Sequence, residues 1–194
     1  MNSPGTTGNP GQMPLDPDRM PPCIRSATEN DLPALASLDA EAFPEEPYPF
    51  FVLRQYFDVC RGHFLVLDDG HILYGYLIAT PPADGRSWVL SLGVIPDVRG
   101  HGLGRRLMVE SLRQLRSEGA HEVRLTVDPD NDRAVSLYGH LGFTQEEDVH
   151  KDYLGLGKHR ILMTLKLPDT APPAPGTPPS APSATVNSGR TGGP

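Results

Sequence analysis

The stretch from Leu90 to Arg116, LSLGVIPDVRGHGLGRRLMVESLRQLR, combines an apolar strand pattern, a glycine-rich turn and an amphipathic helix. The first amides of a helix have no partner inside it, and the peptide dipoles give that end a partial positive charge. Glycines in the turn allow a diphosphate to approach those amides without a Cβ in the way. The stretch therefore predicts a site for a phosphate-bearing ligand. The residues predicted to hold it are Arg99, Gly100, His101, Gly102, Leu103, Gly104 and Arg105.

Two other glycine-rich nucleotide motifs fit this turn less well. A phosphate loop of the NTPase kind ends in Gly-Lys-Ser/Thr, whereas this turn continues as Gly104-Arg105-Arg106. A dinucleotide-binding pattern that starts at Gly100 requires glycine where Arg105 stands, although Asp128 lies at a tolerable distance to bind a ribose. The dinucleotide interpretation stays open as an alternative.

The turn also fits the pattern Arg/Gln-x-x-Gly-x-Gly/Ala, as RGHGLG at residues 99–104, and here the chain resembles the GNAT superfamily of acetyl-CoA-dependent N-acetyltransferases. The segment NDRAVSLY at residues 131–138, followed by LGF at 141–143, is similar to that family's Asn-x-x-Ala-x-x-Leu-Tyr … Gly-Phe motif. Residues 152–163 are similar to the ending of the RimI-like N-terminal protein alanine acetyltransferases. The resemblance covers about residues 24–167.

The resemblance implies a fold and a set of site residues. The fold is α/β (α+β), with a mixed, mostly antiparallel central sheet, a central parallel strand pair and about four flanking helices. Acetyl-CoA is the implied co-substrate, and its pantetheine arm pairs with Leu92, Gly93 and Val94 at a bulge in the strand. Asn131 contacts the coenzyme or its bound water. Tyr138 matches the family's general acid, which protonates the sulfur as it leaves.

The general base has no clear counterpart. RimI-like enzymes place a glutamate where this chain has Thr126, and a threonine hydroxyl cannot act as a base near neutral pH. Either Thr126 orders a water that passes the proton on, or a different group accepts it. Glu41, Glu45 and Glu46 are candidates, because in the resembled family the loop that carries them walls the acceptor site. Each of these glutamates also fits an ordinary solvated surface position.

Three functions remain in competition. The first is acetylation of a protein N-terminus or another peptide amine, and the second is the same chemistry on a small amine such as an amino sugar, a polyamine or an amino acid derivative. The third is a sensor module that binds acyl-CoA without turning it over. Tyr138 favours turnover over sensing. The ending at residues 152–163 favours peptide acceptors, because in RimI-like enzymes the loop between these strands borders the peptide groove.

Hydrophobic spacing outside the central stretch predicts strands and helices that alternate along most of the chain. A strand–helix–strand crossover around the central helix implies parallel pairing of its two strands. Strands are expected at residues 23–26, 64–67, 72–79, 87–94, 122–127, 144–153 and 160–167, and helices at 32–42, 50–60, 103–118 and 131–141.

Composition divides the chain of 194 residues into a domain and two tails, because its 22 prolines and 20 glycines crowd the ends. The Pro/Gly-rich residues 1–22 and the Pro/Ala/Ser/Thr-rich residues 168–194 have too little apolar surface to offset the entropy of ordering them. We therefore expect both tails to be disordered and the acetyltransferase-like domain to span residues 23–167.

Charge and cysteine usage restrict the partners and the location. A net charge of −7 argues against a broad basic face for nucleic acid and favours a cationic amine as second substrate. Two cysteines and scattered histidines predict neither a disulfide framework nor a metal site. The first residues lack a secretory signal pattern, and no run is apolar enough to span a membrane. We expect a cytoplasmic protein, a monomer or dimer, with no membrane partner.

Overall fold

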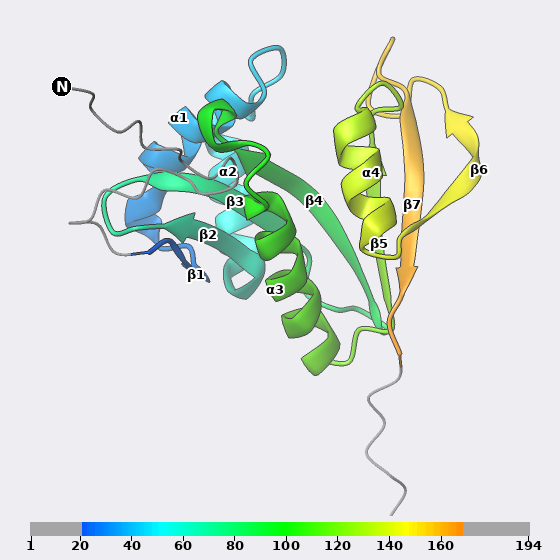
Figure 1. Ribbon diagram of the computed structural model, residues 1–194, viewed down its shortest axis with the longest axis horizontal. Helices are drawn as coiled ribbons and strands as arrows, with labels where there is room; N and C mark the ends of the chain where they lie inside the picture. Colours follow the sequence, from blue (N-terminus) through cyan, green and yellow to red (C-terminus); the bar gives the residue numbers. More distant parts are fainter. Residues whose placement is uncertain (1–20, 169–194) are drawn as a thin grey trace, which may run out of the picture.

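A mixed sheet runs through the computed structural model, which describes residues 21–168 (Figure 1). Its seven strands lie in the order β1-β2-β3-β4-β5-β7-β6, and only the β4–β5 pair is parallel. The expected fold class, a mostly antiparallel sheet with a central parallel pair, is confirmed. The strands are β1 (Cys23–Ser26), β2 (Phe64–Asp68), β3 (Leu73–Ala79), β4 (Arg86–Val94), β5 (Glu122–Val127), β6 (Thr144–His150) and β7 (Arg160–Lys166).

Helices cover both faces of this sheet. On one face α3 packs against β2, β3 and β4, and the buried side of α4 joins the same apolar cluster. On the other face α1 packs against β3 and β4 and is covered by α2, which closes a second cluster. Apolar side chains recur at helical spacing in these segments, so each helix has one apolar face to bury. The helices are α1 (Leu32–Ala42), α2 (Phe50–Val59), α3 (Leu103–Ser117) and α4 (Asp132–His140).

Strands β4 and β5 separate part-way along their length. Their pairing runs from Arg86 with Glu122 to Val89 with Leu125, after which β4 continues to Val94 beside β3 alone (Figure 1). The separation coincides with a β-bulge in β4, since Ala79 of β3 pairs with Val89 but Ile78 pairs with Ser91. Leu90 is the extra residue of this bulge and has no partner in β3. The bulge expected at residues 92–94 therefore lies a little earlier, and residues 92–94 pair regularly with β3.

The predicted strand at residues 144–153 is shorter in the structure. Strand β6 ends at His150, and three of the following residues have left-handed backbone that no strand contains: Asp152 (φ 54°), Gly155 (φ 119°) and Gly157 (φ 77°). The resulting β6–β7 loop reaches the loop between α1 and α2, where Lys158 Nζ lies 2.9 Å from Glu46 Oε1. Two loops far apart in the sequence thus lie side by side.

The tails expected at residues 1–22 and 168–194 lie outside the described residues, apart from residues 21, 22 and 168. Between residues 21 and 168, none of the helices combines the length and the apolar character that crossing a membrane requires.

Candidate active site

The turn between β4 and α3 presents a run of unpaired backbone amides. Gly100 and Gly102 have φ values of +90° and +77°, which glycine adopts without a Cβ penalty. Helix α3 has no side-chain cap, and Arg106 N–H makes its first intrahelical bond, to the carbonyl of Gly102 at 3.0 Å. The N–H groups of residues 100–105 therefore donate to no group within the described part of the chain. Together with the helix dipole, they form a binding site suited to an anion.

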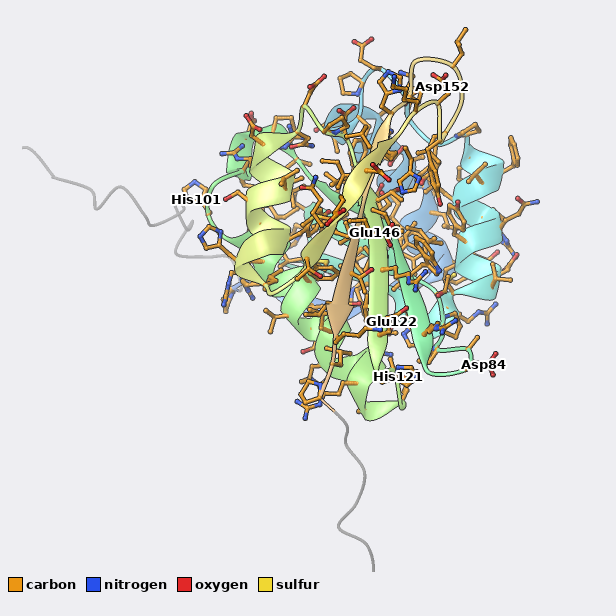
Figure 2. The ribbon with its side chains drawn as sticks, turned by 90° about the vertical axis from the view of Figure 1, so that its right-hand side faces the viewer. Asp84, His101, His121, Glu122, Glu146 and Asp152 are labelled. Carbon is orange, nitrogen blue, oxygen red and sulfur yellow. The ribbon has the colours of Figure 1, made fainter. Side chains whose placement is uncertain are left out.

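Basic side chains around this turn divide into two kinds. Arg99 belongs to the framework, since its Nε donates to the carbonyl of Val94 at 3.0 Å and its Nη2 to that of Ala42 at 2.9 Å. Arg105 and His101 are exposed, and Figure 2 shows His101 projecting from the turn into solvent. Arg133 of α4 also reaches the turn, because a Cβ built on Gly100 would lie 3.5 Å from its Nη2. Arg105, His101 and Arg133 are placed to contact an anion.

The end of β4 offers an open edge next to this turn. Ile95 N–H donates to the carbonyl of Tyr74 in β3 at 3.0 Å. Because amides alternate sides along a strand, those of Leu92 and Val94 face away from β3, on the side that β5 has left. Packing explains why residue 93 between them is a glycine, since an added Cβ would lie 2.5 Å from Cε1 of Tyr76. An extended ligand can therefore pair with β4 through Leu92 and Val94.

Gly104 is the point where strand, turn and α4 meet. A Cβ added there would lie 3.7 Å from Cδ2 of Leu92 and 3.7 Å from Cδ2 of Leu137, which is ordinary van der Waals contact. The predicted ligand-binding residues of β4 and α3 are thus brought against α4. At the start of α4, Asn131 Oδ1 accepts the amide of Ala134 at 3.1 Å, so this residue caps the helix and keeps its amide NH₂ free for a ligand.

Tyr138 lies on the buried side of α4 with 8% of its surface exposed. Its ring packs tilted against Phe143, with centroids 5.9 Å apart. Its hydroxyl makes no hydrogen bond within residues 21–168, and its oxygen is not fully sealed from solvent. Burial raises the pKa of Tyr138 to about 12, so the phenol is protonated at neutral pH. It is an available proton donor.

The carboxylates considered as bases lie at the surface. Glu41 and Glu45 are exposed, and Glu46 is exposed and paired with Lys158. Thr126 is half-buried on the face opposite to the α3 and α4 helices, and its hydroxyl makes no hydrogen bond within the described residues. None of these positions combines burial with a carboxylate. Asp128, the acid of the dinucleotide alternative, accepts the amide of Asp130 and lies 3.5 Å from Arg160.

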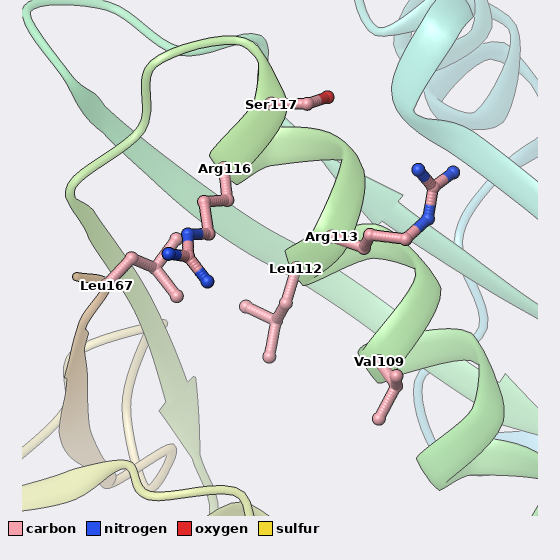
Figure 3. A pocket seen from close by; sticks show the side chains of 6 residues that line it. All are labelled: Val109, Leu112, Arg113, Arg116, Ser117 and Leu167. Atoms are coloured by element: carbon pink, nitrogen blue, oxygen red, sulfur yellow. The ribbon is translucent and has the colours of Figure 1, made fainter. Parts of the chain in front are cut away.

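A pocket of about 330 Å³ lies elsewhere, between the outer side of α3 and the end of β7 (Figure 3). It contains none of the residues predicted for the site. The residues that line it are Val109, Leu112, Arg113, Arg116, Ser117 and Leu167.

Comparison with known proteins agrees with this arrangement of strand, turn and helix. The profile of the acetyltransferase (GNAT) family matches residues 31–143, which include the turn, the open edge of β4 and Tyr138. The chain belongs to the GNAT acetyltransferase family. Membership in this family accounts for the glycine turn without the dinucleotide alternative.

Curated relatives in the GNAT family are longer than this chain. The mycothiol acetyltransferase of Saccharopolyspora erythraea is 39% identical over 84 residues, which are 43% of this chain and 28% of the relative. That of Beutenbergia cavernae is 36% identical over 137 residues, 65% of this chain and 45% of the relative. The chain spans less than half the length of either relative.

Among solved GNAT structures, the ribosomal-protein-S18-alanine N-acetyltransferase of Escherichia coli superposes with a TM-score of 0.68. The match covers 79% of this chain and 97% of the other, at 22% identity, and identity this low carries the fold alone. This similarity agrees with the GNAT fold and leaves the acceptor open.

Arg133 is a candidate that sequence reasoning passed over, although it stands inside the segment NDRAVSLY. The available signal was a basic residue in the first turn of a helix, where a cation is unfavourable unless an anion lies nearby. Only the structure places this helix end beside Gly100.

We expect Arg105→Ala and Arg133→Ala each to weaken binding of coenzyme A by about fivefold and to leave the thermal unfolding midpoint unchanged, because both guanidinium groups are exposed. Arg99→Ala should instead lower the free energy of unfolding by about 1–3 kcal/mol, since two carbonyls lose their donor. Isothermal titration with coenzyme A and thermal unfolding of the three variants measure both quantities. Loss of affinity in Arg99→Ala at unchanged stability would place Arg99 on the ligand instead.

Proposed function

We propose that this protein transfers an acetyl group from acetyl-CoA to a primary amine, with a protein N-terminus or another peptide amine as the first acceptor class. The observation that carries the proposal is the run of unpaired amides at residues 100–105, which follows directly on the open edge of β4. A protonated phenol on the adjoining helix, without a hydrogen-bond partner among residues 21–168, supplies the acid that such a transfer requires. A sensor module would have no use for that phenol.

In this proposal acetyl-CoA supplies the activated acyl group as a thioester. The amides of residues 100–105, with Arg105 and Arg133, bind its phosphates, and the amides of Leu92 and Val94 hold the pantetheine arm along β4. This anchoring directs the thioester toward the gap between the ends of β4 and β5. Positioning of this kind lowers the barrier because the reacting groups no longer have to find one another.

Tyr138 gives its proton to the sulfur as the carbon–sulfur bond breaks. The pKa of this phenol, about 12, is higher than that of a free thiol, which is near 8.5. The difference corresponds to about 5 kcal/mol. Transfer of this proton is therefore uphill and short-lived. The phenol donates a hydrogen bond until negative charge develops on the sulfur, and the tyrosinate formed by the transfer takes a proton back from solvent. Burial ensures that the proton is present at every physiological pH.

The acceptor is expected on the sheet face opposite α3 and α4, where the α1–α2 loop meets the β6–β7 loop. Exposed Glu41 and Glu45, together with the net charge of −7, favour a cationic amine over an anionic acceptor. A small, mycothiol-related amine is the second candidate, because the curated relatives with 36–39% identity are named mycothiol acetyltransferases.

A thiol-release assay tests the proposal. The purified full chain is mixed with acetyl-CoA and, in turn, with alanyl, seryl and methionyl peptides that carry free N-termini, with glucosamine, with spermidine and with S-methylcysteine, whose sulfur cannot react with the thioester. We expect release of coenzyme A that depends on one of these amines, and mass spectrometry of the product should show one added acetyl group. Tight binding of acetyl-CoA with no transfer to any amine would contradict the proposed enzymatic function and favour a sensor module.

A further inference from the structure

Asp39 is a carboxylate that the roles described above leave unused. It lies on α1, is fully buried, and forms no ion pair with any residue between 21 and 168. Its Oδ1 accepts the hydroxyl of Tyr76 from β3, and its Oδ2 accepts the amide of Tyr48 at 2.5 Å. Buried carboxylates are costly without a cationic partner, so one that is held only by neutral donors is a candidate for a functional role.

The hydrogen bonds of this group have a defined direction. The hydroxyl of Tyr76 also lies 2.8 Å from Oγ of Ser91 in β4. Tyr76 has a single hydroxyl proton, and a carboxylate can only accept, so that proton is committed to Asp39. Burial raises the pKa of Tyr76, which keeps the proton in place. Ser91 must therefore donate to Tyr76, and its own lone pairs remain free to accept a proton from elsewhere.

Ser91 is positioned at the reacting end of the site. It is half-buried and lies in the part of β4 that β5 no longer covers, directly after the bulged Leu90 and next to Leu92. In the β3–β4 register Ser91 shares the face of Ile78 and Tyr76, which is the α1 and α2 face. The coenzyme site approaches the same strand segment from the α3 and α4 side. An amine that attacks from the acceptor side therefore meets Ser91 first.

We propose that Ser91, backed by Tyr76 and Asp39, accepts the proton that the acceptor amine loses when it attacks the thioester. The inference rests on the acetyl transfer proposed above. As the carbon–nitrogen bond forms, the amine proton passes to Ser91 Oγ, the Ser91 proton to Tyr76 Oη, and the Tyr76 proton to Asp39 Oδ1. The carbon–sulfur bond breaks, and the sulfur takes the proton of Tyr138. Asp39 then releases a proton to solvent and Tyr138 regains one, so the cycle balances.

The surroundings of Asp39 suit a proton acceptor. The titratable groups that face it are Tyr76 from β3 and Tyr48 from the α1–α2 loop. Beyond Tyr48 lie Tyr56 of α2, in edge contact with its ring, and Arg160 of β7, a cation whose charge acts on Tyr48. The carboxylate of Asp39 has no cation in direct contact among the described residues, and its charge favours the positive charge that develops on the amine nitrogen as it attacks on the Ser91 side of β4.

A purely structural role is the competing hypothesis, because Asp39 also ties the α1–α2 loop to α1 through the amide of Tyr48. The two roles separate at Ser91, which has no part in that tie. If Asp39 only holds the loop, Ser91 can be replaced by alanine at little cost to turnover, whereas the loss of a proton acceptor lowers turnover. Ser91→Thr keeps the hydroxyl and should keep the function.

The test compares Ser91→Ala, Ser91→Thr and Tyr76→Phe with Thr126→Val, which removes the half-buried hydroxyl that a competing proton path through a water would use. Each variant is assayed with acetyl-CoA and the fastest acceptor of the panel, from pH 6.5 to 9.5. We expect Ser91→Ala and Tyr76→Phe to lower kcat by about 30-fold at pH 7 with KM nearly unchanged. The deficit should shrink toward pH 9.5, where hydroxide from solvent can take the proton that the attacking amine loses. Ser91→Thr should restore most of kcat.

Thermal unfolding of the same variants distinguishes chemistry from folding, and Ser91→Ala should shift Tm by less than about 5 °C. An unchanged kcat in Ser91→Ala, or a deficit that does not depend on pH, overturns the relay while acetyl transfer stands. A large loss in Thr126→Val alone would move the proton path to a water at Thr126. Absence of transfer by the wild-type protein overturns both the relay and the proposed function.

Discussion

Tyr138→Phe is expected to lower kcat by about 1000-fold while the affinity for coenzyme A stays within about twofold. The substitution removes one oxygen that has no hydrogen-bond partner in the described residues and leaves the ring against Phe143. No described residue loses a hydrogen bond, so the unfolding midpoint should not fall. Only the transition state, in which the sulfur acquires charge, loses a donor. The thiol-release assay and isothermal titration give the two quantities.

The pH dependence of Tyr138 has a definite sign. Burial raises the pKa of the phenol to about 12 in the folded protein, against about 10 in the unfolded chain. The stabilisation associated with this shift is fully present below pH 10 and is lost as the pH rises from about 10 to 12. Tyr138 therefore stays protonated between pH 7 and 9.5, and its ionisation should cause no fall in the wild-type rate over this range.

Tyr74→Phe is the matched control for Tyr138→Phe. The hydroxyl of Tyr74 donates to Asp69 Oδ2 at 2.7 Å, so its loss should lower stability by about 1–3 kcal/mol and leave kcat unchanged. The two tyrosines thus predict opposite signatures, one kinetic and one thermodynamic. A Tyr138→Phe variant that keeps wild-type turnover, or one that behaves like Tyr74→Phe, would remove the acid assignment.

Local pattern determines most of this fold. Apolar spacing in α3 and the alternation in β5 each specify a buried face, and Pro33 and Pro44 stand where α1 begins and ends. The glycine turn could be located from residues 99–104 alone, because closely spaced glycines are typical of backbone with positive φ, which Gly100 and Gly102 adopt. The strand at 144–150 ended early because a left-handed residue at Asp152 is not recognisable from its type.

Contacts between distant segments could not be predicted in this way. The sequence predicts Arg99 as a ligand-binding arginine, and only the structure shows that its guanidinium donates to the carbonyls of Val94 and Ala42. Asp39 interrupts the apolar stripe of α1 between Leu35 and Ala42, which was a signal for a buried polar group. Its partner Tyr76, however, comes from a strand whose position over α1 depends on the whole sheet. The chemistry of a site therefore needs the tertiary contacts, even where its scaffold does not.

Gly102→Asp should weaken binding of coenzyme A by at least about 100-fold, the second large effect. The residue precedes α3 in a left-handed conformation (φ +77°), and no atom lies within 4 Å of an added Cβ. A side chain therefore fits, and a carboxylate at the N-terminal end of a helix favours the helix by about 0.3–1 kcal/mol, which offsets much of the backbone strain. The folded state survives, but the negative charge now occupies the position that attracts a diphosphate. At 4 Å and an effective dielectric constant near 20, one such repulsion costs about 4 kcal/mol.

Gly102→Asn separates charge from shape. Asparagine has nearly the same volume as aspartate and tolerates left-handed backbone equally well, yet it carries no charge. We expect Gly102→Asn to bind coenzyme A within about tenfold of the wild type and Gly102→Asp to recover part of its affinity at high salt, where exposed charges are screened. Isothermal titration at two ionic strengths measures both. Equal losses in the two variants would mean that bulk at Gly102 obstructs the ligand, and undiminished affinity in both would place the phosphates away from the amides of residues 100–105.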